Sequence, residues 1–277
     1  RYATVFGYRL QERVGQGGFG HVFKAVGPDG KPYAVKLLRS EVFEDSEKLG
    51  SFRRGVRSMR ILGNRSIAGV VAWKAAYEMP AAVVMEFVSG ADLAQAIELG
   101  ELSLGNRLRI ALALAEILHA AHTVPERVLH RDVRPANVML RDFYMDPEES
   151  EVLLLDFDLS WHREALERSI QLSGAGALAY AAPEQLGVLG ATTRSALVAV
   201  FGLGMTVFHL FSRRAPTLGE YQQADWAERV TRECAGRTSG WDSFGERIAR
   251  LVVACTRPTQ VERWDLTQVL NELRRLR

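Results

Sequence analysis

The sequence predicts an α+β protein with a small lobe built on an antiparallel sheet and a larger, mainly helical lobe. Short apolar runs separated by turn residues fill the first part of the chain, which is typical of strands. Beyond residue 89, apolar residues recur at helical spacing instead. A chain of 277 residues with 47% hydrophobic content can bury a core for one large domain or for two lobes sharing a cleft. We expect one domain over residues 1–277, with its small lobe at about 1–88 and its helical lobe at about 89–277.

The small lobe is expected to contain five strands and one helix. The first three strands form a meander, because a glycine cluster and Pro28-Asp29-Gly30 supply its two turns. Apolar side chains repeat at helical spacing from Ser46 to Leu62 and predict the helix. The expected strands cover residues 8–14, 21–26, 32–38, 70–76 and 81–87.

The large lobe is expected to be helical over most of its length. A long helix is predicted over residues 104–122, and three more between residues 220 and 276. The tryptophans expected to anchor the last three are Trp226, Trp241 and Trp264. The longest apolar stretch, Ala196 to Phe211, is shorter than the roughly 20 residues that span a bilayer, and it contains His209. We therefore predict a buried helix there and no membrane segment.

Charge and cysteine content exclude several classes of function. The formal net charge is +2 with neither a basic block nor an acidic tail, so we expect no nucleic-acid partner. Cys234 and Cys255 lack the spacing of disulfides or metal ligands, which favours a reducing, cytoplasmic compartment. His119 and His122 lie one helical turn apart, but no third ligand is near them in sequence. We interpret them as surface or core residues rather than as a metal site.

Two short motifs carry the chemistry that the sequence predicts. His130-Arg131-Asp132-Val133-Arg134-Pro135-Ala136-Asn137 is followed, 19 residues after Asn137, by Asp156-Phe157-Asp158. Both are expected on turns beside short apolar strands. One acid of such a set can orient a hydroxyl nucleophile, while the amide and the other acid hold magnesium on phosphates. The two motifs together indicate phosphoryl transfer.

A glycine-rich turn and a lysine point to the same chemistry. The turn Gly15-Gln16-Gly17-Gly18-Phe19-Gly20-His21-Val22 joins the first two expected strands, and its missing side chains let backbone N–H groups approach phosphates closely. Alone, such a turn is equally typical of a plain hairpin. Ala34-Val35-Lys36 on the third strand adds a cation suited to the α- and β-phosphates, with a solvated lysine as the alternative.

With Ala182-Pro183-Glu184 further along, these motifs resemble the eukaryotic-type protein kinase family, and its bacterial serine/threonine branch in particular. The resemblance covers about residues 8–276. It implies a bilobal protein kinase-like fold, ATP and Mg²⁺ as cofactors, and a protein substrate or a regulatory protein as partner.

The resemblance also assigns the residues of the predicted site. Asp132 would orient the hydroxyl, Lys36 and Arg134 would hold phosphates, and Asn137 and Asp156 would bind magnesium. Met85 would be the gatekeeper, and backbone groups of Glu86 and Val88 would bind adenine. The residues implied to bind the nucleotide are Gly15, Gly17, Gly18, Gly20, Val22, Ala34, Lys36, Met85, Glu86, Val88 and Met139.

Supporting contacts are implied as well. His130 would pack beneath the magnesium loop, Arg131 would receive a phosphate from the activation segment, and Glu184 would pair with Arg263. The candidate phosphorylation sites are Ser160, Ser169 and Ser173. We interpret the acidic segment over residues 141–151 as an exposed insertion loop, with a partner-binding surface as the alternative.

One departure from the family pattern concerns the partner of the lysine. Gly55 stands where the helix glutamate that pairs with the lysine is usual, and Glu41, Glu44 or Glu47 would have to substitute for it. If the missing ion pair is a handicap, Gly55→Glu should raise turnover; an unchanged rate would mean that another residue supports Lys36.

Three further supporting positions differ. Asp158 replaces the glycine that usually closes its triplet, and Ala177 replaces a threonine that touches the catalytic aspartate. Ala199 replaces an aspartate that anchors the backbone of the catalytic loop, whose N–H groups would then need another partner.

We therefore expect a serine/threonine protein kinase that is slow or activated by a partner, because the groups of the chemistry are retained and their supports are altered. The alternative is a pseudokinase that acts as a nucleotide-binding or scaffolding regulatory module. A small-molecule phosphotransferase of the antibiotic-kinase type is a third interpretation. It is disfavoured because Arg131 and the Ala-Pro-Glu segment with Arg263 belong to the protein-directed branch.

Overall fold

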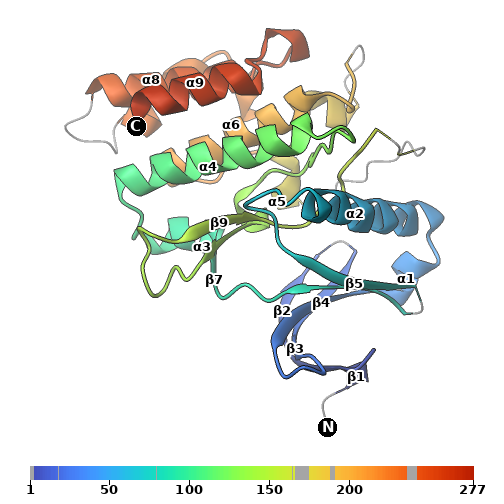
Figure 1. Ribbon diagram of the computed structural model, residues 1–277. Coiled ribbons are helices and arrows are strands. Elements are labelled where there is room, and N and C mark those ends of the chain that lie inside the picture. The colour runs from blue at the N-terminus through green and yellow to red at the C-terminus, as the bar shows by residue number, and fades with distance from the viewer. Residues whose placement is uncertain are drawn as a thin grey trace.

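The computed structural model has two lobes, with a sheet and α2 (Ser46–Asn64) in the lower part of Figure 1 and a set of helices in the upper part. It describes residues 3–17, 19–78, 80–163, 165, 175–187, 191–235 and 242–277. Four residues singled out from the sequence lie outside these ranges, namely Gly18, Ser169, Ser173 and Trp241. The predicted α+β class with two lobes is confirmed.

The small lobe is built on one antiparallel sheet of six strands. They are β1 (Thr4–Val5), β2 (Tyr8–Gln16), β3 (Gly20–Val26), β4 (Pro32–Leu38), β5 (Trp73–Glu78) and β6 (Ala81–Glu86), in the order β1-β2-β3-β4-β6-β5. The short β1 adds to the five expected strands. β5 begins later than expected, because the Leu154 N–H donates to the Gly69 carbonyl at 2.7 Å and the Val71 N–H donates back to Leu154 at 3.4 Å. Those residues tie the small lobe to the large one.

The small lobe carries α2 and a four-residue helix, α1 (Ser40–Phe43), which the expectation of a single helix did not include. α2 begins after Asp45, whose carboxylate accepts the backbone N–H groups of Glu47 and Lys48 and so caps the helix. The helix packs on β5. Its buried apolar residues are Phe52, Met59 and Leu62.

The large lobe is mainly helical and also contains a three-stranded sheet. The strands are β7 (Gly90–Asp92), β8 (Val138–Arg141) and β9 (Glu151–Leu154). The helices are α3 (Leu93–Leu99), α4 (Leu104–Thr123), α5 (Ala175–Leu178), α6 (Ala196–Ser212), α7 (Trp226–Ala235), α8 (Asp242–Cys255) and α9 (Leu266–Leu276). Short 3₁₀ turns are η1 (Pro135–Asn137), η2 (Pro183–Leu186), η3 (Glu220–Gln222) and η4 (Gln260–Glu262).

α6 is the predicted buried helix, and it contacts α4, α7, α8 and α9. Figure 1 shows α4, α6, α8 and α9 gathered on the side of the molecule away from the small sheet. Among the residues that the structure describes, no helix combines the length and the apolar character that crossing a bilayer requires.

The segment between β8 and β9 is only partly the exposed loop that the sequence predicts. Phe143 is fully buried and Ser150 is 1% exposed, and the Arg109 guanidinium donates to the Ser150 hydroxyl at 3.2 Å. Tyr144 and Met145 are 66% and 86% exposed. The expectation of a solvated loop was therefore wrong for its two flanks, because Phe143 is buried in the core and Arg109 of α4 holds Ser150.

Candidate active site

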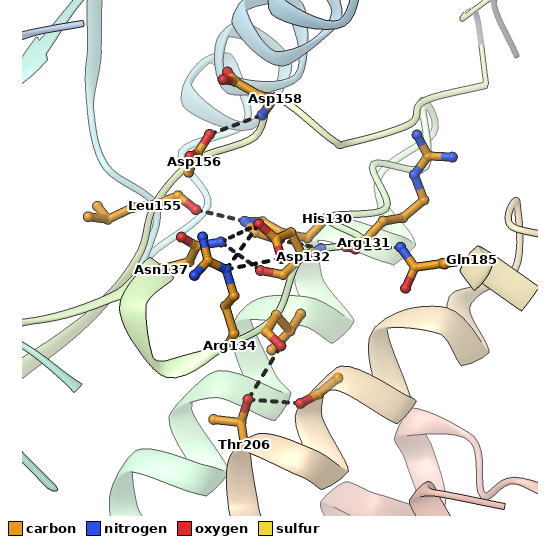
Figure 2. A network of polar contacts seen from close by, with 12 residues as sticks. His130, Arg131, Asp132, Arg134, Asn137, Leu155, Asp156, Asp158, Gln185 and Thr206 are labelled. Atoms are coloured by element: carbon orange, nitrogen blue, oxygen red, sulfur yellow. Dashed lines mark hydrogen bonds and ion pairs between the residues drawn. The ribbon is translucent and has the colours of Figure 1, made fainter. Parts of the chain in front are cut away.

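The catalytic loop holds its aspartate through two side chains (Figure 2). The Asn137 amide nitrogen donates to the Asp132 carboxylate and to the Asp132 carbonyl, each at 2.8 Å, and the Arg134 Nε lies 3.2 Å from the carboxylate. The loop passes into η1 and then β8, which fixes Asn137 at the start of a strand. In the described part of the chain nothing donates to the Asn137 amide oxygen. That oxygen therefore remains available to a cation.

Asp156, the second acid of the site, follows β9 in a left-handed backbone conformation with a φ of 58°. Such a conformation is uncommon outside glycine and persists where the surroundings impose it. The His130 imidazole imposes part of it, since its Nε2 lies 2.7 Å from the Leu155 carbonyl and its ring is 4.7 Å from the ring of Phe157. His130 lies beneath this loop, as expected. Burial lowers the pKa of His130 and so favours the neutral ring.

Lys36 on β4 is held by both acids of the triplet. Its Nζ lies 2.9 Å from Asp156 Oδ1 and 2.6 Å from Asp158 Oδ2. Burial alone would lower the pKa of Lys36, but the two carboxylates outweigh it and raise the pKa. Burial and the neighbouring Asp156 raise the pKa of Asp158, whereas the lysine outweighs burial at Asp156 and lowers its pKa. The ammonium group is therefore charged and paired.

The partners of Lys36 are thus Asp156 and Asp158 rather than the α2 glutamate of the family or any of Glu41, Glu44 and Glu47. Within the described ranges the ion pairs of Lys36 go to the Asp156-Phe157-Asp158 triplet alone. α2 lies against that triplet at Gly55, where an added Cβ would come within 2.9 Å of the Phe157 carbonyl oxygen and 3.0 Å of the Asp158 Cα. The glycine that removes the usual partner therefore also makes room for its replacement.

The catalytic loop is anchored without the aspartate that Ala199 replaces. The Gln185 amide on η2 donates to the Arg131 carbonyl at 2.8 Å, and Figure 2 shows it reaching the loop from that side. The Asp132 N–H donates to His130 Nδ1 at 3.2 Å. Arg131 itself has a φ of 63°, so the loop is held in a left-handed turn at this point. These two supports come from side chains of η2 and of the loop itself.

α6 supports the same loop from below. The Thr206 hydroxyl donates to the Gly202 carbonyl at 2.8 Å and lies 3.4 Å from the Val133 carbonyl. A Cβ on Gly202 would come within 2.8 Å of that Val133 carbonyl oxygen. The helix backbone therefore touches the loop directly, and only a glycine permits the approach.

Arg131, the expected acceptor of an activation-segment phosphate, donates through Nε to the Leu159 carbonyl at 2.7 Å. Burial, together with the nearby cations of Arg54 and Arg194, lowers the pKa of Arg131 to about 9. Ser160 is fully buried, and its hydroxyl donates to the Ser58 hydroxyl at 2.8 Å. The expectation of Ser160 as a phosphorylation site is therefore wrong for this conformation, because no kinase could reach that oxygen.

The glycine turn between β2 and β3 is folded toward the site. The Arg39 guanidinium donates to the Gly17 carbonyl at 2.8 Å, and Phe19 is buried in a small cluster with Leu159 and Leu38. Gly15 pairs with Val22 across the hairpin. A Cβ on Gly20 would collide with the Leu37 carbonyl, so the turn requires glycine there for close approach to β4.

The other predicted nucleotide contacts line the junction of the lobes. Ala34 on β4 pairs with Met85 on β6, and Val22 pairs with Lys36. Met139 on β8 lies beside Asp92. These pairings place the residues on neighbouring strands on both sides of the hinge.

The hinge is held by the side chain of Glu86, a residue of which only the backbone was expected to matter. The Glu86 carboxylate accepts the Ala72 N–H at 2.8 Å and the Arg141 guanidinium at 2.9 Å, and the Glu86 N–H donates to the Ala72 carbonyl. No described backbone group bonds to the Val88 N–H, which leaves it available to a ligand.

The predicted pair between Glu184 and Arg263 is present. The two side chains form a bidentate contact at 2.6 and 2.8 Å and are fully buried, and the Gln260 amide adds a third donor to the carboxylate. Because neither side chain is exposed, the role of the pair is structural.

Sequence reasoning missed the roles of Asp158, Gln185 and Thr206. For Asp158 a signal existed, because a lysine without its usual glutamate was accompanied by an extra carboxylate two residues from the metal-binding acid. Gln185 and Thr206 carried no such signal, because their contacts join segments far apart in the chain.

The residues present fit magnesium bound together with phosphates. Magnesium in such sites takes one or two carboxylates, while water and substrate phosphates supply its other ligands. Asp156 and the free amide oxygen of Asn137 match that description. Within the described ranges, the site included, no cluster of three or more His, Cys, Asp or Glu residues is suited to a metal by itself.

The two-lobed fold and the site, with its paired lysine, two acids and an amide, are those of the protein kinase class. The sequence profile of the protein kinase domain matches residues 8–273. This chain therefore belongs to the protein kinase family.

Its curated relatives include bacterial and plant kinases. It is 31% identical over 266 residues to the probable serine/threonine-protein kinase PkwA of Thermomonospora curvata, covering 92% of this chain and 33% of the relative. Identity to the serine/threonine-protein kinase PknJ of Mycobacterium tuberculosis is 30%, covering 77% of this chain and 35% of PknJ. Calcium-dependent protein kinase 25 of Arabidopsis thaliana is 27% identical, covering 95% of this chain and 49% of that protein. The chain thus spans half or less of the length of these relatives.

Solved structures agree on the fold. The kinase domain of Mycobacterium tuberculosis PknI is similar with a TM-score of 0.71 and 21% identity, over 99% of this chain and 98% of that one. The predicted protein kinase-like fold, with an antiparallel sheet in the small lobe and a mainly helical large lobe, is confirmed.

Proposed function

We propose that this chain is an ATP- and magnesium-dependent serine/threonine protein kinase, with Asp132 as the residue that orients the acceptor hydroxyl. The observation that carries the proposal is the arrangement around that carboxylate. Asn137 and Arg134 both hold it, while Asp156 and Lys36 form the second half of the site. An acid held by an amide and a cation is suited to accepting a hydroxyl hydrogen bond.

Each side chain has a distinct task in this proposal. Lys36 neutralises phosphate charge, and Asp156 with the Asn137 amide oxygen holds magnesium. Asp132 orients the serine or threonine hydroxyl and takes up its proton, while Arg134 balances the charge that develops beside it. Bound ATP supplies the phosphoryl group that is transferred.

The proposed rate is modest. Ala177 offers no hydroxyl to the catalytic aspartate, and Arg134 occupies its carboxylate instead at 3.2 Å. A misplacement equivalent to about 1.4 kcal/mol costs tenfold in rate. The proposed acceptor is a protein, and the proposed compartment is the cytoplasm, where ATP is supplied.

The proposal is tested by autophosphorylation followed by intact mass, with Asp132→Asn as the control. We expect a mass gain in multiples of one phosphate in the wild type and none in the variant. Thermal melting with ATP and magnesium runs in parallel. A nucleotide at 100 times its dissociation constant adds about 2.7 kcal/mol to the free energy of unfolding.

The second candidate is a pseudokinase. It is favoured by Phe19, a residue of the glycine turn, because this side chain is buried against Leu159. A magnesium-dependent melting shift without phosphate on the chain or on a general substrate such as casein would support it. No shift at all would contradict both the kinase and the nucleotide-binding module, and would leave a scaffold.

A further inference from the structure

We propose that Asp158 is the positioning residue for Lys36. In this proposal Gly55 and Asp158 form one unit, in which the carboxylate partner of the lysine has moved from α2 to the Asp156-Phe157-Asp158 turn, here called the metal loop. The inference rests on the proposed function for its consequence in nucleotide binding. The ion pair itself stands on the geometry of the apo chain.

Burial makes the pairing necessary. The Lys36 side chain is 6% exposed and that of Asp158 is 8% exposed, with 2.6 Å between their charged atoms. An ammonium group removed from water requires a compensating charge, and leaving it unpaired is strongly destabilising. Asp158 is placed to compensate Lys36 within the lobe junction.

Asp156 does not make Asp158 redundant. It also lies 2.9 Å from Lys36, but its side chain is 31% exposed and it is the acid that faces the proposed metal. When magnesium engages Asp156, the more deeply buried Asp158 still neutralises the lysine. One acid therefore serves the metal and the other serves the cation.

Gly55 is the second half of the unit. The metal loop presses on α2 so closely that a Cβ at this position would lie 2.9 Å from the Phe157 carbonyl oxygen and 3.0 Å from the Asp158 Cα. Both are backbone atoms, so relief would require the loop to move. A side chain at position 55 would displace the carboxylate that now replaces the missing glutamate.

A consequence follows for how Lys36 is seated. The metal-binding acid and the lysine's partner lie two residues apart in one turn, which the Asp158 N–H closes with a 3.3 Å bond to Asp156. The position of the Lys36 side chain therefore depends on the metal loop and not on a movement of α2. A partner that swings α2 inward is not needed to form this ion pair.

The pairing is tested first without nucleotide, through the melting temperatures of Lys36→Met, Asp158→Asn and the double variant. We expect Lys36→Met to lower the melting temperature, because the buried carboxylate of Asp158 and the partly exposed one of Asp156 lose their cation. The double variant should melt about 3 °C or more above Lys36→Met, since it removes one of those carboxylates. Additive losses would overturn the pairing, whether or not the chain proves to be a kinase.

The positioning role is tested by separating KM for ATP from kcat. Asp158→Asn should raise KM for ATP about tenfold, with a smaller change in kcat. Asp225→Asn, which removes an exposed aspartate paired with Arg229, is the matched control and should change neither. If Asp158→Asn changes KM and kcat no more than Asp225→Asn does, the positioning role is contradicted.

The coupling to Gly55 has its own test. Gly55→Glu alone should weaken binding of ATP with magnesium, measured by the melting shift, and Gly55→Glu combined with Asp158→Gly should recover part of it. Tighter binding by Gly55→Glu alone would overturn the unit. If the wild type shows no shift, the proposed function fails, while the melting comparison of Lys36 and Asp158 still decides the pairing.

Discussion

Glu184 and Arg263 show what a single buried ion pair contributes to this chain. Neither side chain is exposed, and the carboxylate also receives the Gln260 amide. Removing one member would leave an uncompensated charge in the core. The pair joins η2 to the last part of the large lobe, so losing it should lower the free energy of unfolding.

We expect Arg263→Met to lower the free energy of unfolding by about 3–5 kcal/mol, measured by urea denaturation. The matched control is Arg274→Met, which breaks the exposed pair with Glu116 and should cost less than about 1 kcal/mol. Similar losses in both variants would show that the Glu184 carboxylate finds another cation.

The close contact at Gly55 reverses the expectation for Gly55→Glu. The sequence alone suggested that restoring the glutamate should raise turnover. The contact between Gly55 and the Phe157 carbonyl shows that there is no space for it, and Asp158 already supplies the charge. The expected result is therefore a loss.

At the scale of elements, α6 acts as a platform for the catalytic loop. Its Gly202 lies against the Val133 carbonyl, and Thr206 reaches the same atom. Together with Gln185 on η2, it holds a loop that lacks the usual aspartate. The geometry of Asp132 therefore depends on how closely this helix approaches.

We expect Gly202→Ala to lower turnover at least about tenfold, because a displacement of the loop costs about 1.4 kcal/mol per tenfold of rate. Gly63→Ala on α2 is the control, since a Cβ there meets nothing within 4 Å. It should raise the free energy of unfolding by up to about 1 kcal/mol and leave turnover unchanged. Unchanged turnover in Gly202→Ala would mean that the loop is held without α6.

Two partly buried histidines, His122 and His209, link the stability of the whole molecule to pH. Burial, with nearby cations, lowers the pKa of His122 to about 3 and that of His209 to about 4. Neither ring nitrogen of His122 has a hydrogen-bond partner among the described residues, whereas the His209 Nδ1 lies 2.7 Å from the Tyr180 hydroxyl. Both rings are therefore neutral in the folded state.

The unfolded chain takes up these protons as pH falls through about 6.5, while the folded chain does not, so stability is lost from about pH 6.5 downward toward 4. Each histidine contributes a slope of up to about 1.4 kcal/mol per pH unit. We expect His122→Leu to reduce this slope in urea unfolding between pH 6.5 and 4. A slope equal to that of the wild type would show that His122 is protonated in the fold.

Much of this fold follows from pattern. Strands β2, β3, β4 and β6 and helices α2, α4 and α6 lie close to where alternation, turn residues and helical spacing predict them. β5 starts late because the residues before it bond to the distant Leu154, and β1 is additional because its two residues are too few for an alternating pattern. Pairing with a distant segment leaves no periodic trace in the sequence.

The motifs of the sequence predicted the class of the protein, which is confirmed, and the residues that we propose to contact phosphate, magnesium and hydroxyl. Phosphoryl transfer requires particular side chains, so its candidate residues can be recognised in the sequence, namely Lys36, Asp132, Asn137 and Asp156. Only the tertiary structure decided what supports them, namely Asp158 for the lysine, and Gln185 and Thr206 for the loop. Support is a matter of position, and any carboxylate or amide that the fold brings within reach can supply it.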